Sequence, residues 1–159
     1  MGFSAAAAGG VIGAYGAYQG ASAQKDALNF NADVAGRNAD FSGWQAQQVA
    51  RAGGIQEQNQ RLKTAALAGD QRLALAANGV DIGQSGSAQD VLSSTAYMGE
   101  RDALTIRDNT AMQVYGYKRQ QANYLSEAAQ YRKGAGNINP SLAAAGSLLG
   151  SASQLKFPG

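Results

Sequence analysis

Bulky apolar side chains are scarce in this chain, and their scarcity limits the folds that it can adopt. Only 27 of the 159 residues are Leu, Ile, Val or Phe, whereas alanine and glycine account for 33 and 21. Such a composition approaches that of disordered chains, but a net charge of +2 gives little self-repulsion. We therefore favour helices that pack closely through small side chains, with disorder as the alternative. Identical copies would complete a core that one copy cannot fill.

The residue types that are missing exclude most catalytic chemistry. The chain has no cysteine and no histidine, which excludes disulfides, zinc sites of the usual ligands, and Ser-His or Cys-His catalysis. Glu100 and Asp102 form the densest acidic cluster, but residues two apart on a helix point to different sides, so ion pairs are expected there. No glycine run continues into Gly-Lys-Ser/Thr. We predict a protein that is not an enzyme and has no cofactor or metal.

Charge divides the chain into three regions. Residues 1–24 form an uncharged, Gly/Ala-rich N-terminal segment, predicted to face a membrane or a channel. Residues 25–133 hold nearly all the charge and are predicted to form a helical hairpin with a loop near 78–87. Residues 134–159 are predicted to form an uncharged C-terminal helix and tail, in which Lys156 is the one charge after Lys133. The 13 Lys and Arg residues are scattered, so no dedicated nucleic-acid surface is expected.

Small residues recur at every fourth position in both uncharged segments, a spacing typical of helices that approach closely in lipid. We predict a role in a membrane or pore, or in close helix packing, for Gly9, Gly13, Gly16, Ala17, Gly20, Gly146 and Gly150. About 20 helical residues would span a bilayer, but the segment is poor in Leu, Ile and Phe. A flexible tail is one alternative. A secretory signal ending at Ala21-Ser22-Ala23 is another.

Larger side chains repeat every seven residues in the middle region, which predicts the seam of helices packed at a shallow angle. Val34, Phe41, Ile55, Leu62 and Ala76 share one lattice, widened by Trp44. A second lattice holds Ala96, Ala103, Thr110, Tyr117, Tyr124 and Tyr131, flanked by Leu92, Gly99 and Ile106. We assign Phe41, Trp44, Ile55, Leu62, Leu92, Ile106, Tyr117, Tyr124 and Tyr131 to an oligomer or hairpin interface. A base-stacking platform is the alternative for the tyrosine row.

Stop and start signals place the reversal of the chain. Asn78-Gly79 is suited to a helix C-terminus, and Ser87 with Asp90 is suited to an N-cap and first turn. Pro140 is suited to the first turn of a further helix. The predicted fold is all-α: a long antiparallel helical hairpin with Gly/Ala-rich helical terminal segments, assembled as a ring-like homo-oligomer. A hairpin would bring both uncharged segments to one end of the molecule.

A group of short motifs between residues 77 and 129 resembles a phage family. They are Asn78-Gly79-Val80-Asp81, Ser85-Gly86-Ser87-Ala88, Asp90-Val91-Leu92, Gly99-Glu100, Asp102-Ala103-Leu104-Thr105-Ile106-Arg107 and Tyr115-Gly116-Tyr117. The stretch is similar to the small internal virion protein, internal virion protein B, of short-tailed T-odd-type bacteriophages. The rest of the chain is similar to that family in composition, although its C-terminal end lacks an extended charged tail.

The resemblance implies a location and partners. Such proteins lie inside the capsid above the portal, leave through the tail on infection, and associate with the host outer membrane. There they form a conduit for DNA with larger internal core proteins, and DNA passes without sequence-specific binding. The alternative is a purely structural virion component, such as a head-tail or tail protein with no membrane role. A secreted pore-forming toxin and a single-strand nucleic-acid binder are further alternatives.

Overall fold

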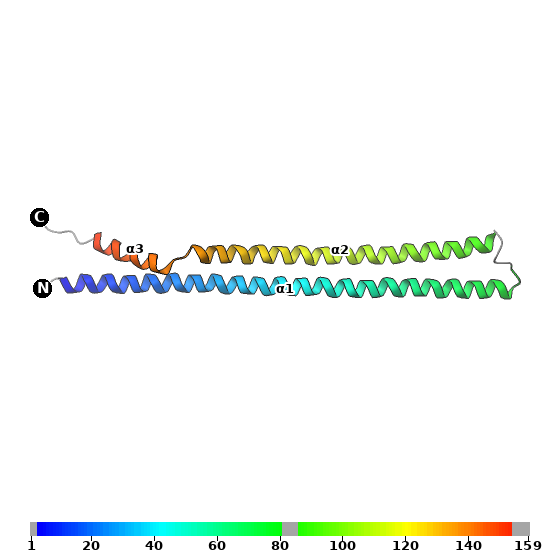
Figure 1. Cartoon of the computed structure of the whole chain (residues 1–159), viewed down its shortest axis with the longest axis horizontal. Helices are drawn as coiled ribbons and strands as arrows, with labels where there is room; N and C mark the ends of the chain where they lie inside the picture. Colours follow the sequence, from blue (N-terminus) through cyan, green and yellow to red (C-terminus); the bar gives the residue numbers. More distant parts are fainter. Residues whose placement is uncertain (1–2, 81–85, 154–159) are drawn as a thin grey trace. The chain divides into compact units, whose positions relative to one another are not determined.

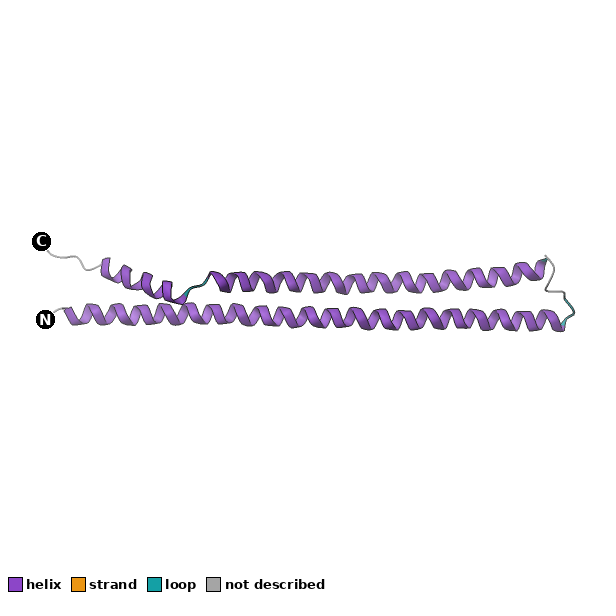
Figure 2. Ribbon diagram, in the orientation of Figure 1, coloured by secondary structure: helices purple, strands orange, loops and turns teal. Residues whose placement is uncertain are grey.

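The computed structural model describes residues 3–80 and 86–153, and these residues form three helices (Figures 1 and 2). Helix α1 spans Phe3–Ala77, α2 spans Ser87–Asn137 and α3 spans Pro140–Ser153. The described residues include no strand, which confirms the all-α prediction. The predicted boundaries at 24/25 and 133/134 fall inside α1 and α2, so they divide the chain by composition and not by secondary structure.

The end of α1 has the geometry that Asn78-Gly79 predicts. Gly79 has a positive φ of 72°, a conformation that costs glycine little because it has no Cβ. The amide of Val80 donates to the carbonyl of Leu75 at 3.0 Å, and the amide of Gly79 donates to the carbonyl of Ala76 at 3.0 Å. These two bonds form a Schellman motif, which satisfies carbonyls that the last turn would leave unpaired.

The observed N-terminal caps of α2 and α3 can be compared with the predicted helix starts. The amide of Asp90 donates to the carbonyl of Gly86 at 3.1 Å, so Gly86 takes the N-cap position and Ser87 is the first helical residue. The prediction of Ser87 as the cap was wrong by one residue. Asn139 caps α3, because its Oδ1 accepts from the amide of Leu142 at 3.3 Å. Pro140 then stands at the first helical position, as predicted.

The chain divides into two compact units. Unit 1 comprises residues 1–40 and 122–159, and unit 2 comprises residues 41–121. In unit 2 the second half of α1 and the first part of α2 run antiparallel, because Thr64 lies against Gly99 whereas Gly53 lies against Thr110. In unit 1 the first half of α1 contacts both α3, at Ser147, and the end of α2, at Gly134.

The buried residues are almost all small. Among the residues whose burial is described, ten apolar residues are buried, and nine of them are alanines: Ala14, Ala32, Ala35, Ala39, Ala46, Ala88, Ala103, Ala128 and Ala135. The tenth is Leu92, and Ser42 is also buried. Alanine at these positions lets the helix backbones approach closely, so contact between backbones replaces the burial of large side chains. The described residues leave no buried side-chain polar atom without a partner.

Candidate functional site

Two reciprocal Gly–Thr contacts form the tightest part of the seam in unit 2. A Cβ on Gly53 would overlap the side chain of Thr110, whose own Cβ lies 2.7 Å from that position. A Cβ on Gly99 would overlap Thr64 in the same way, with the Cβ of Thr64 at 2.6 Å. Each glycine therefore provides the hollow that the threonine of the other helix fills. The two contacts fix which turn of α1 faces which turn of α2.

The threonine hydroxyls are bonded to their own helices, which fixes both side chains. Thr64 Oγ1 donates to the carbonyl of Gln60 at 3.0 Å, and Thr110 Oγ1 donates to the carbonyl of Ile106 at 2.8 Å. A β-branched side chain in a helix has few rotamers, and the hydroxyl bond selects among them. Neither threonine can therefore turn away from the opposing glycine without losing a hydrogen bond.

Arg61 joins the two helices beside these contacts. Its guanidinium donates to both carboxylate oxygens of Glu100, at 2.7 and 2.9 Å, and to Glu57 at 3.0 Å. The hydrogen bond to Glu57 is the largest cause that raises the pKa of Arg61, followed among the favourable causes by the charge of Glu100. A bidentate Arg–carboxylate pair has a defined orientation, but both side chains are exposed and the pair is screened by solvent.

Amide and hydroxyl groups continue the polar character of the seam in unit 2. Thr95 Oγ1 donates to Gln71 Oε1 at 2.9 Å, and Gln60 Nε2 donates to Asp102 at 3.4 Å. Glu100 thus forms an ion pair with α1 of the same chain, whereas Asp102 accepts a hydrogen bond from a neutral amide of α1. Among the described residues, no group of three acidic side chains is placed to hold a metal ion.

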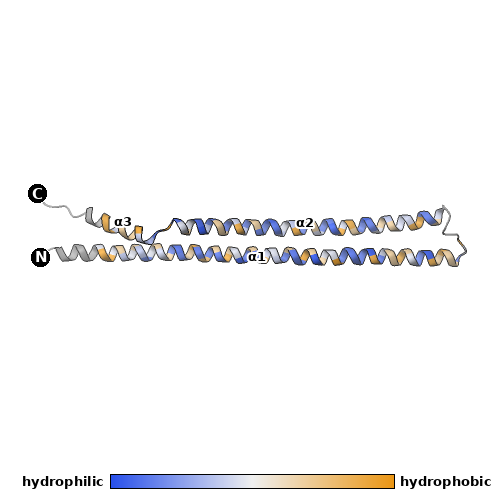
Figure 3. Ribbon diagram, viewed as in Figure 1, coloured by the Kyte–Doolittle hydropathy of each residue, from blue (hydrophilic) through white to orange (hydrophobic). Residues whose placement is uncertain are grey.

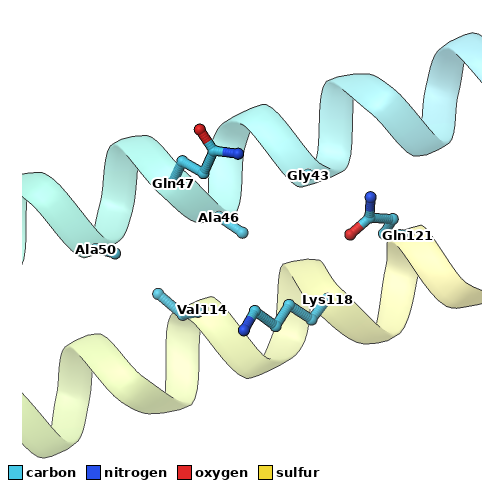
Figure 4. A pocket seen from close by; sticks show the side chains of 7 residues that line it. All are labelled: Gly43, Ala46, Gln47, Ala50, Val114, Lys118 and Gln121. Carbon is cyan, nitrogen blue, oxygen red and sulfur yellow. The ribbon is translucent and has the colours of Figure 1, made fainter.

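A groove of about 350 Å³ opens between α1 and α2 at one end of unit 2 (Figure 4). Its lining is Gly43, Ala46, Gln47 and Ala50 from α1, and Val114, Lys118 and Gln121 from α2. The side-chain amide of Gln121 lies over Gly43, with Nε2 2.7 Å from the position of a Cβ. The groove contains one cation and two amides, and its remaining surface is aliphatic.

Unit 1 brings the two uncharged segments together. A Cβ on Gly13 would lie 3.4 Å from Ser147 Oγ of α3, and Ala14 beside it is buried. Hydropathy is high along α3 and mixed in the first part of α1 (Figure 3). Large apolar side chains of this pair are exposed, namely Val11, Ile12, Tyr15, Tyr18, Leu142, Leu148 and Leu149. The pair therefore presents an uncharged apolar surface.

Close packing is seen at few of the predicted small residues. Gly13 contacts α3 and Ala17 is half-buried, whereas no atom lies within 4 Å of a Cβ built on Gly16, Gly20, Gly146 or Gly150. Gly9 lies in α1, but its surroundings are outside the described residues. No helix in the described ranges is both long and apolar enough to cross a membrane. Their role in a membrane or pore stays a prediction.

The two predicted interface rows lie in different surroundings. On α2, Leu92 is buried in the seam, and Ile106, Tyr117, Tyr124 and Tyr131 are half-buried. On α1, Phe41, Trp44, Ile55 and Leu62 are 54–60% exposed, outside the seam. Phe41 and Trp44 stack on each other, with ring centroids 5.9 Å apart. The α1 row is therefore mostly exposed in the hairpin, and its contact between copies remains a prediction.

The seam residues of α1 were missed by the sequence reasoning. They are small residues at spacings of three, four and, at the last step, seven: Ala32, Ala35 and Ala39 in unit 1, and Ser42, Ala46 and Gly53 in unit 2. This spacing is the signal that could have found them, because it marks one face of a helix. The prediction instead followed the larger side chains of the α1 row, which lie on the opposite face of the helix.

Comparison with known families gives a match over nearly the whole chain. The T7 virus internal virion protein gp14 family matches residues 1–156. No curated protein and no solved structure matches significantly. The chain belongs to the T7 virus internal virion protein gp14 family, which confirms the predicted resemblance and places the protein in the virion.

Proposed function

We propose that this internal virion protein is released on infection and helps to form a conduit across the host cell envelope, through which the phage DNA is delivered. Several copies form a ring, together with larger internal core proteins and the portal or tail. DNA passes without sequence-specific recognition. The observation that carries the proposal is the uncharged pair of helix segments in unit 1, with its exposed apolar side chains.

The composition of this pair is suited to conditional insertion. Residues 2–24 contain no charged side chain, and neither does α3. No described helix is apolar enough to span a bilayer by itself, so insertion by a single copy would be weak. Several copies bury the polar backbone and small residues against one another and present Val11, Ile12 and Leu149 to lipid. The ring is therefore the form that inserts.

Membrane flotation tests the proposal. Protein released from virions by osmotic shock is mixed with vesicles of outer-membrane lipid and centrifuged through a density gradient. We expect it to float with the vesicles and both termini to be protected from protease. Ile12→Lys and Leu149→Lys place a charge in the apolar surface and should abolish flotation.

Leu73→Lys is the matched control, because Leu73 is as exposed as Leu149 but lies in unit 2. It should float like the unchanged protein. If the released protein stays at the bottom of the gradient and both termini are cleaved, the conduit is excluded. A purely structural role in the virion, as a head-tail or tail component, then remains.

A further inference from the structure

The face of α2 that contacts α1 in unit 2 is complementary to itself. Gly99 and Thr110 are eleven residues apart on α2, and Gly53 and Thr64 are eleven residues apart on α1. In the hairpin, each glycine receives the threonine of the other helix. Two antiparallel helices that share one Gly–Thr spacing can be aligned so that each glycine lies opposite the threonine of the other helix. A second copy of α2 therefore offers the same two contacts that α1 offers.

The charges agree with this self-pairing. Glu100 and Arg107 are seven residues apart, so they lie on one flank of α2. A twofold axis between antiparallel helices brings each flank against its own copy. When Gly99 of each copy lies opposite Thr110 of the other, Arg107 of the second copy is two residues away from the residue directly opposite Glu100. In the hairpin, Arg61 is likewise two residues away from the α1 residue directly opposite Glu100, and it binds that carboxylate. Arg107 of the second copy is therefore placed to bind Glu100 in the same way.

The apolar residues of α2 also find suitable partners. In the hairpin they face a polar part of α1, where Glu57, Gln60 and Gln71 are half-buried in the seam. In the self-paired register Leu92 lies opposite Tyr117, and Ile106 lies opposite Ala103. Apolar side chains of α2 then contact one another, and the amides of α1 return to solvent, where they cost no desolvation.

We propose that α2 forms an antiparallel pair with α2 of a second copy of this chain, in which Gly99 of each copy receives Thr110 of the other. This pair and the hairpin use one face of α2, so they exclude each other within unit 2. The protein thus has two ways to cover the same surface. The pairing rests on unit 2 alone and does not depend on the function proposed for unit 1.

Site-specific thiols test the pairing in the full chain, which has no natural cysteine. Ala103 is 0% exposed in the hairpin, so a thiol there is covered while the hairpin is closed. A chain with Ala103→Cys is mixed with a chain with Ile106→Cys under mild oxidation, and disulfide-linked heterodimers are identified by mass spectrometry. Thr105→Cys, on the exposed side of α2, is the control. We expect the 103–106 disulfide to form faster than any disulfide to position 105.

A matched pair of glycine substitutions separates self-pairing from simple opening. Gly53→Ala produces a clash with Thr110 in the hairpin only, whereas Gly99→Ala clashes with Thr64 in the hairpin and with Thr110 in the self-pair. Both therefore weaken the hairpin by similar contacts. We expect Gly53→Ala to raise the 103–106 yield about tenfold, and Gly99→Ala to give no rise. Equal yields from the two variants, or no preference over position 105, would overturn the proposal.

Discussion

Thr110 fills the space that Gly53 leaves open on the opposite helix. The hydroxyl of Thr110 donates a hydrogen bond to the carbonyl of Ile106 at 2.8 Å. The Cβ of Thr110 lies 2.7 Å from the position that a Cβ on Gly53 would take. Real Cβ atoms do not approach so closely. The thin core of unit 2 thus gains specificity from backbone contact, which a single added methyl group is sufficient to disturb.

Gly53→Ala should lower the free energy of unfolding by about 1–3 kcal/mol, the usual cost of overpacking. Thr110 is short and β-branched, so the helices themselves must separate to admit the methyl group. Urea denaturation followed by circular dichroism measures the change. Gly54→Ala is the control, because no atom lies within 4 Å of its Cβ position, and it should stabilise α1 by about 0.5–1 kcal/mol. A Gly53→Ala protein as stable as Gly54→Ala would contradict the contact.

Gly79 supports a prediction about the end of α1. Its φ of 72° lies in the left-handed region, so Gly79→Ala should cost about 1–2 kcal/mol through strain at Cβ. The Schellman bonds from Val80 and Gly79 would weaken with it. Thermal unfolding measures the loss. Gly69→Ala, inside α1 with open space around its Cβ position, should instead raise the melting temperature, and equal effects of the two substitutions would show that φ is not the cause.

Arg61 provides a test that depends on salt. Arg61→Lys keeps the charge but loses the bidentate contact with Glu100 and the bond to Glu57. Because Arg61 and Glu100 are exposed, and only Glu57 is half-buried, we expect a smaller loss of stability than for Gly53→Ala. The difference from the unchanged protein should shrink as sodium chloride is raised, because salt screens exposed pairs. Melting temperatures of both proteins at low and high salt measure this difference. A large loss of stability in Arg61→Lys that salt does not alter would be inconsistent with an exposed ion pair.

The sequence predicted the helices and their ends better than the face by which α1 packs. Local sequence signals were sufficient to predict the helix ends at Asn78-Gly79 and Pro140, because a helix cap depends on backbone geometry within a few residues. The seam depends on both helices at once. On α2 the half-buried side chains include Tyr117, Tyr124 and Tyr131, whereas the buried residues of α1 are all small.

That combination explains why Phe41, Trp44, Ile55 and Leu62 were expected in an interface that the hairpin does not provide. Large side chains usually mark the buried face of a helix. Here two large faces cannot meet where Gly53 and Gly99 require close backbones. The exposed row on α1 therefore needs a partner outside unit 2 if it is to be covered, and no single-chain sequence pattern identifies it.

Tyr131 supports a prediction for alkaline pH. Its hydroxyl donates to Glu127 at 3.1 Å, and this bond, with the charge of Glu127, raises the pKa of Tyr131 above its ordinary value of 10.0. The protonated phenol is thus favoured in the folded chain, so its contribution to stability is complete below pH 10 and is lost as pH rises through the raised pKa. Comparing the ultraviolet titration of the protein with that of Tyr131→Phe should reveal one late-titrating tyrosine. Glu127→Gln should return that tyrosine toward the ordinary range, and an unchanged titration in Glu127→Gln would show that Glu127 is not the cause.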